Sequence, residues 1–385
     1  METTFPFGLS GTTQFYMALY VVTLAIHVFL MTYVLAGSAV MAFAVIFPGE
    51  GEQPRTSQPL LTVLRDWSPF VLSGAITAAV APLLFVQILY PRYFYTANLL
   101  LGWRWMVVIP VLILAFYLLY LIKSKMASKW NAVARTALVV SACGCFLFVA
   151  FCWTANHLLS ISPGSWTSAY MSGRTIESYF AVATRLSTWV SGAFPTMSVL
   201  AAWQLAYRKP ASEAEDDALA LEPKRLAYIA VSGLIAAVLF SMLYLIAMGP
   251  VSRGAVLGAP GRVWVGLLGM GIVAQAAVWW VQRKEEDFRL VYLAIIAGGS
   301  VLTLLATASL REVIRLSQVD HTLVATTTGS AAKVDGFWVF VAFVVMNFGL
   351  IGYCVWLVRT KLLPTPDSPV TREDRPAGNA PGERG

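Results

Sequence analysis

The residue of this chain that is best placed to do chemistry is a histidine inside a long apolar segment. His27 lies in the run from Thr12 to Phe47, which contains no Lys, Arg, Asp or Glu. An imidazole at membrane depth is costly unless it is hydrogen-bonded or acts as a ligand, so it is a functional candidate. A neutral imidazole can ligate a haem iron between facing helices. The alternative is a structural histidine bonded to a neighbouring carbonyl or hydroxyl group, with Thr23 and Tyr33 nearby.

Four further polar residues lie at or near the ends of apolar segments and could hold a cofactor. His157 could bind a cofactor or, as a boundary residue, bond to groups of the following loop. Arg104 and Arg185 could pair with haem propionates, although most such arginines extend their charge to the membrane surface. Gln87 could bind a quinone headgroup or another helix.

The composition indicates a membrane protein rather than a soluble enzyme. The chain has 385 residues, 58% of them hydrophobic and only 12% charged, with a mean hydropathy of +0.69. Soluble domains contain about 25% charged residues. We therefore interpret the net charge of +7 as a signal of topology and not of nucleic-acid binding. The sequence contains no glycine-rich phosphate loop, no HExxH motif and no pair of carboxylates within an apolar segment.

Apolar runs predict an all-α, polytopic fold with nine membrane spans, because a helix needs about 20 apolar residues to cross the hydrocarbon. The expected spans are residues 13–47, 67–90, 101–122, 133–160, 178–207, 226–249, 262–282, 289–309 and 336–359. Small residues such as those at 297–300 favour close approach of helices.

The basic residues predict an orientation, and the composition predicts a division into parts. More Lys and Arg follow the odd-numbered spans than the even-numbered ones, which favours an outer N-terminus and a cytoplasmic C-terminus. We expect a five-helix part over 1–208, a cytoplasmic linker over 209–224, a four-helix part over 225–361 and a disordered tail over 362–385.

The segment from Leu310 to Val334 is expected to lie outside the membrane. Its first residues, REVIRLSQ, carry apolar side chains at 313, 314 and 316, which fit a short interfacial helix. A polar loop should follow, with His321 in ordinary contact with solvent.

The order of several short motifs resembles subunit I of the cytochrome bd oxidase superfamily over residues 12–208. The motifs are Gln14-Phe15 before a first helix with a histidine, Gly74 through Gln87 to Tyr93 and Tyr95, Ala155-Asn156 followed by Pro163-Gly164, and Ser191-Gly192-Ala193 through Ala201-Ala202-Trp203. The nine-span count and the outer N-terminus also agree with that family. The resemblance implies a four-helix bundle core with further spans, and it implies that His27 ligates a haem.

The chain departs from the family where the other redox groups should be held. Thr184 or Arg185 stands in the place of the family's fifth-helix haem ligand, and residues 103–122 contain no acidic residue. The loop over 249–262 is short and lacks the family's quinol-binding motif. The resemblance therefore implies a scaffold with at most one b-type haem, and not a complete quinol oxidase.

Three functions remain open from the sequence. The first is a bd-like integral subunit of a bacterial respiratory or electron-transfer complex in the inner membrane, bound to other subunits and to an outer cytochrome c or similar protein. The second is a cofactor-free membrane anchor of such a complex. The third is a secondary transporter, although the spans show no inverted repeat and no central carboxylate.

Overall fold

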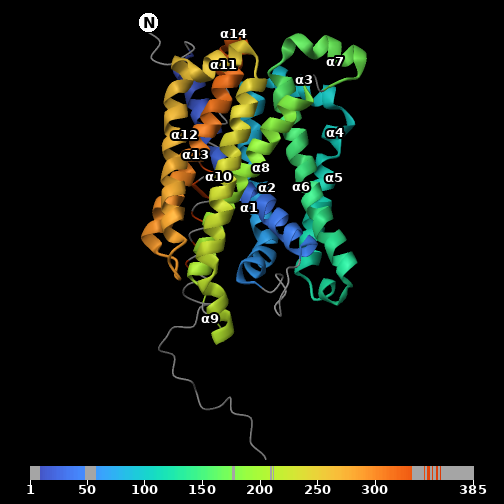
Figure 1. Ribbon diagram of the computed structural model, residues 1–385. Helices are drawn as coiled ribbons and strands as arrows, with labels where there is room; N and C mark the ends of the chain where they lie inside the picture. The colour runs from blue at the N-terminus through green and yellow to red at the C-terminus, as the bar shows by residue number, and fades with distance from the viewer. Residues whose placement is uncertain are drawn as a thin grey trace, which may run out of the picture. The chain divides into compact units, whose positions relative to one another are not determined.

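The computed structural model describes residues 9–47, 58–175, 178–208, 210 and 212–331, with a few single positions beyond 340 (Figure 1). The chain divides into two compact units at residues 329 and 330, and the following description concerns the first. Every secondary-structure element in the described ranges is a helix, which confirms the predicted all-α class.

The long helices run side by side, and short helices lie at their ends (Figure 1). The long ones are α1 (Gly11–Ile46), α2 (Pro59–Leu89), α5 (Val108–Lys123), α6 (Ala132–Ser160), α8 (Tyr179–Ala206), α10 (Glu222–Ala247), α12 (Ala259–Gln282) and α13 (Leu290–Leu316). The short ones are α3 (Pro91–Leu101), α4 (Trp103–Met106), α7 (Trp166–Ser172), α9 (Glu213–Ala220), α11 (Pro250–Leu257) and α14 (His321–Ala331). In Figure 1, α3, α7, α11 and α14 lie at the upper end, and α9 lies at the lower end.

Seven helical segments among the described residues are long and apolar enough to cross a membrane, so the prediction of nine is wrong for this part of the chain. They are Gly11–Ile46, Pro59–Leu89, Trp103–Lys123, Ala132–Ser160, Glu213–Ala247, Ala259–Gln282 and Leu290–Leu316. The expected fifth span is present as α8, with 28 residues, but its Ser and Thr residues and Arg185 make it too polar to be counted with the seven. The expected ninth span, 336–359, lies almost wholly outside the described residues.

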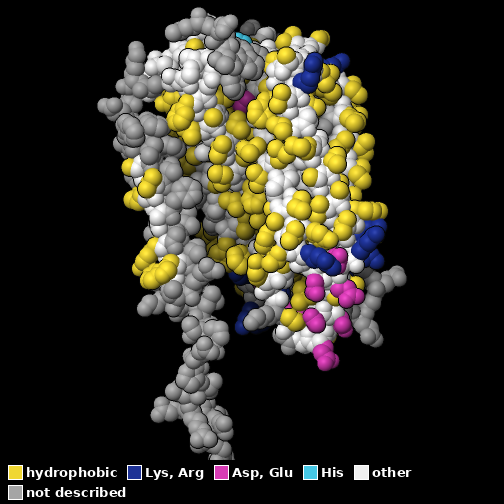
Figure 2. All heavy atoms as spheres, turned by 90° about the vertical axis from the view of Figure 1, so that its left-hand side faces the viewer, with side chains coloured by type: hydrophobic (Ala, Val, Ile, Leu, Met, Phe, Trp, Pro, Cys, Tyr) yellow, Lys and Arg dark blue, Asp and Glu magenta, His cyan; other side chains and the backbone are white. Residues whose placement is uncertain are grey.

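The arrangement of side chains on the surface supports a multi-pass membrane protein. Hydrophobic side chains cover the middle of the face in Figure 2, and charged side chains gather mainly towards its two ends. Helix α9, at the lower end in Figure 1, carries Glu213, Glu215 and Asp216 in its first turn. Large apolar side chains are exposed on the long helices, for example Ile109 on α5 (68%) and Val291 on α13 (69%). Lipid is the solvent that makes such exposure favourable.

Helix α1 is the most buried of the seven spans, and four other long helices pack against it. Its most apolar stretch is 56% buried, against 17% for the span that contains α5, and it contacts α2, α6, α8 and α13. The helix begins where the Ser10 hydroxyl accepts a hydrogen bond from the backbone N–H of Thr13 at 3.3 Å. Such a cap satisfies one of the free amides of the first turn. His27 is thereby placed on the central helix.

Two expectations for the segment after residue 309 are wrong. Residues 310–316 do not form a separate interfacial helix but continue α13, with Val313, Ile314 and Leu316 buried. His321 does not lie in a loop but begins α14, and its Nε2 atom donates to the Leu316 carbonyl at 2.6 Å. Asp320 accepts hydrogen bonds from the amide and hydroxyl of Thr322, and these bonds hold the pKa of Asp320 below its usual range.

Helices α12 and α13 approach closely at glycines, as the small residues predict. A Cβ atom on Gly271 would lie 2.6 Å from Thr303 Oγ1 and 2.9 Å from the Gly299 carbonyl oxygen. Gln275 bridges the same two helices, because it donates to Thr303 Oγ1 at 2.8 Å and accepts from Ser300 Oγ at 2.7 Å. The contact therefore combines close backbone packing with a satisfied polar bridge.

Gly271→Ala should lower the melting temperature of the purified protein, followed by tryptophan fluorescence in detergent. The added methyl group costs about 1–3 kcal/mol of overpacking, only partly offset by about 1 kcal/mol of improved helix propensity. Gly269→Ala on the same helix is the control, because no heavy atom of the described residues lies within 4 Å of its Cβ position. An equal melting temperature for the two variants would show that the helices do not pack in this way.

Candidate functional site

His27 reaches from α1 to the backbone of α2. Its Nδ1 atom lies 2.9 Å from the Ala75 carbonyl oxygen. A carbonyl oxygen only accepts, so Nδ1 carries the proton, and Nε2 of the neutral ring keeps its lone pair. Thr23 and Tyr33 are not its partners, because their hydroxyls donate to Leu19 O and Gln204 Oε1 instead. The bond to Ala75 agrees with a structural histidine, and it also leaves one nitrogen able to act as a ligand.

His157 has the opposite arrangement in the last turn of α6. The side chain is 2% exposed, and its Nδ1 atom lies 3.0 Å from Nη2 of Arg315 on α13. A guanidinium group has no acceptor, so Nδ1 must hold the lone pair and Nε2 must hold the proton. Nε2 is buried without a hydrogen-bond partner among the described residues. His157 is therefore a buried, unsatisfied donor, and its expected role as a bonding partner of loop groups is not what the structure shows.

Arg315 is the centre of a buried group of charged side chains. Its Nη1 atom lies 3.3 Å from Glu312 Oε1, and both side chains are 3% exposed. Glu312 Oε2 also accepts from the Tyr90 hydroxyl at 2.8 Å. The guanidinium carbon of Arg315 lies 4.5 Å from the centre of the Tyr90 ring and 5.8 Å from that of Tyr20. These contacts satisfy a charge that would otherwise be costly to bury.

Two more arginines complete this group, which we call the arginine cluster: His157, Arg185, Arg311, Glu312 and Arg315. Arg311 donates to the Tyr20 hydroxyl, and its Nη1 atom lies 3.8 Å from Glu312 Oε1. Arg185 is 5% exposed and donates to the Tyr244 hydroxyl of α10 at 2.6 Å. Arg185, Arg311 and Arg315 all lie close enough to His157 to act on it electrostatically.

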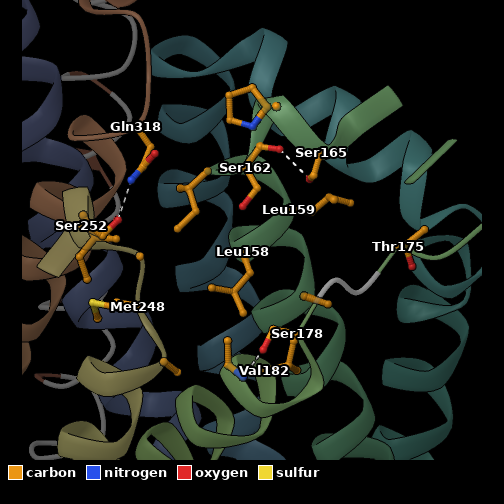
Figure 3. A pocket seen from close by; sticks show the side chains of 18 of the residues that line it. Leu158, Leu159, Ser162, Ser165, Thr175, Ser178, Val182, Met248, Ser252 and Gln318 are labelled. Atoms are coloured by element: carbon orange, nitrogen blue, oxygen red, sulfur yellow. Dashed lines mark hydrogen bonds between the residues drawn. The ribbon is translucent and has the colours of Figure 1, made fainter. Parts of the chain in front are cut away.

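Figure 3 shows a cavity of about 630 Å³ that meets the arginine cluster through Tyr244, although none of the five side chains of the cluster lines it. Its wall comes from the end of α6, the turn over Pro163–Ser165, the start of α8, the end of α10, and α11 and α13. Tyr244 belongs both to this wall and to the bond with Arg185. In Figure 3, Gln318 and Ser252 lie on one side of the cavity, Thr175 lies on the other, and Leu158 lies between them.

The structure brings together three of the five residues that the sequence singled out. His157 and Arg185 belong to the arginine cluster, and Arg104 donates to Thr175 Oγ1 of the cavity wall at 3.3 Å. Gln87 lies apart and accepts from the Tyr95 hydroxyl of α3 at 3.0 Å. No described contact joins His27 to any of these four side chains.

Glu312, Arg315 and Tyr244 were not identified as site residues from the sequence. Glu312 and Arg315 were placed in an interfacial segment because the apolar positions 313, 314 and 316 between and beside them fit a short interfacial helix. A signal for burial was present, because a carboxylate and a guanidinium three residues apart can pair on one helix face. Nothing in the sequence around Tyr244 indicated a site residue, because Tyr244 joins the site through its hydrogen bond with Arg185, 59 residues away in sequence.

The described residues contain no group of three or more His, Cys, Asp or Glu side chains that could hold a metal ion. Among these residues, one or two such side chains at most could therefore hold a metal. A haem iron needs only a single imidazole from the protein.

Glu312→Gln should lower the free energy of unfolding by about 3–5 kcal/mol, because it leaves Arg315 buried without its counter-charge. Glu285→Gln is the matched control: Glu285 pairs with Arg289 at 2.8 Å, but the arginine is 59% exposed. Loss of that pair should cost at most about 1 kcal/mol. Chemical denaturation of both variants measures the difference, and equal losses would contradict the burial of the cluster.

Comparison of the chain with protein-family models and with curated proteins finds no match. The resemblance to the cytochrome bd superfamily therefore rests on the sequence motifs alone.

Proposed function

We propose that this chain is a bd-like integral membrane subunit of a bacterial respiratory or electron-transfer complex, with His27 as the ligand of one b-type haem. The observation that carries this proposal is the hydrogen bond from His27 Nδ1 to the Ala75 carbonyl oxygen. Ligating histidines almost always donate their second ring nitrogen to a carbonyl, carboxylate or water, which fixes the ring and leaves Nε2 for the metal. The imidazole of His27 fits that requirement.

The same reasoning disfavours His157 as a second ligand. Its Nε2 atom carries the proton, because Nδ1 accepts from Arg315, so no lone pair is available at the free nitrogen. Arg185, which stands in the place of the family's fifth-helix ligand, donates to Tyr244, and the neighbouring Thr184 hydroxyl donates to the Phe180 carbonyl. These contacts support a subunit with one haem rather than a complete quinol oxidase.

The proposed subunit would act by holding its haem within the membrane. When bound, that haem would carry single electrons between a partner on the outer side, such as a cytochrome c, and other subunits of the complex. His27 would fix the position of the group, and α1, which is the most buried span, would hold His27 rigidly. We place the chain in the inner membrane, with the N-terminus outside and the C-terminus in the cytoplasm.

A reduced-minus-oxidised absorption spectrum of the purified protein tests the haem. We expect a Soret band in the wild type, its loss in His27→Ala, and its retention in His321→Ala, a control that removes an imidazole from the start of α14. A wild-type protein without the band would instead support the cofactor-free anchor. A band that persists in His27→Ala would overturn His27 as the ligand.

Reporter fusions after Gly385 test the orientation. Because the basic residues favour a cytoplasmic C-terminus, a green fluorescent protein fusion should fluoresce, and an alkaline phosphatase fusion at the same residue should be inactive. The opposite pair of results would reverse the proposed topology.

A further inference from the structure

The arginine cluster carries an excess of buried positive charge. It contains three guanidinium groups and one carboxylate: Arg185, Arg315 and Glu312 are buried, and the Arg311 side chain is 12% exposed. His157 adds no negative charge, and its Nε2–H is a further donor without a partner among the described residues. Glu312 Oε1 makes no hydrogen bond to them either, although it lies near Arg311 and Arg315. Because an uncompensated charge is costly in a low-dielectric environment, this arrangement favours a bound anion nearby.

The hydroxyl groups of the adjoining cavity present donors to any ligand inside it. Tyr244 accepts from Arg185 at 2.6 Å, Thr175 accepts from Arg104 at 3.3 Å, and Ser252 accepts from Gln318 Nε2 at 2.9 Å. Each hydroxyl oxygen is thus used as an acceptor by a nitrogen donor, and its own proton is left to donate elsewhere. Two of the three hydroxyls are backed by a guanidinium group, which strengthens them as donors.

The rest of the wall indicates that the ligand also has an apolar part. Leu158, Val182 and Met248 line the cavity together with the hydroxyl groups (Figure 3). The volume of about 630 Å³ lies within the range of small-molecule sites. The cavity lies at the ends of helices that expose apolar side chains along their length, so an amphiphile could reach it from the lipid.

We propose that this cavity binds the carboxylate or phosphate group of an amphiphilic anion, with Tyr244 as a donor to that group. The excess positive charge is what favours an anion over a neutral molecule of the same size. This site is separate from the haem ligand proposed above, because no described contact joins His27 to the cavity. A lipid headgroup and a fatty acid share the required chemistry.

Isothermal titration calorimetry of the full chain in a neutral detergent tests the proposal with two matched pairs of probes. Decanoate is compared with decanol, and short-chain phosphatidylglycerol is compared with phosphatidylcholine of the same chain length. We expect at least one anion to bind at least about tenfold more tightly than its partner without net charge. Tighter binding of decanoate would identify the ligand as a fatty acid, and tighter binding of phosphatidylglycerol would identify it as a lipid headgroup. Equal affinities within both pairs, or no binding of either anion, would overturn the proposal.

Tyr244→Phe then tests the residue. We expect the affinity for the bound anion to fall about tenfold or more, because one hydrogen bond to a charged group is removed while the ring remains. Tyr228→Phe, an exposed position on the same helix, should bind as the wild type does. If Tyr244→Phe does not fold, Thr175→Val provides a second test on the opposite wall of the cavity, away from the hydrogen bond between Arg185 and Tyr244. Wild-type affinity in both cavity variants would show that the anion binds elsewhere.

Discussion

The structure of the helix ends depends on the need to satisfy one buried charge, that of Arg315. A guanidinium group in a low-dielectric environment is tolerated only with a counter-charge and further polar or aromatic partners. Arg315 obtains Glu312 from its own helix, His157 from α6, and the rings of Tyr90 and Tyr20 at the end of α2 and on α1. The ends of four segments that are far apart in sequence are therefore fixed around a single side chain.

The sequence could predict the elements of this fold but not the partners of its buried polar groups. Apolar runs located the helices, since hydropathy and the length needed to cross a membrane act locally. They also located α8, although this helix is too polar to be counted with the seven apolar spans. They failed for residues 310–316, where polar side chains inside a helix are satisfied by other helices. The bond between Tyr90 and Glu312 joins residues 222 positions apart, and no local pattern encodes it. His27 was found because it is the one imidazole in a segment without Lys, Arg, Asp or Glu, whereas Tyr244 gave no comparable signal.

The two intramembrane histidines show why residue type alone does not define a site. His27 and His157 lie on packed helices, yet the group that faces Nδ1 differs, a carbonyl for one and a guanidinium for the other. The carbonyl leaves an acceptor at Nε2, and the guanidinium leaves a donor there. One ring is thereby suited to a metal, and the other is suited to an acceptor oxygen. The distinction depends on a tertiary contact, and so it could not be read from the sequence.

Burial of the arginines also bears on the orientation in the membrane. In the orientation predicted from the sequence, Arg185, Arg311 and Arg315 are counted among the basic residues of the outer side. They are instead held among helices, where Tyr244, Tyr20 and Glu312 are their partners. The topology rule concerns basic residues of short loops and of their flanking segments. With the buried arginines set aside, the remaining basic residues favour a cytoplasmic location of α9 more strongly than the full comparison did.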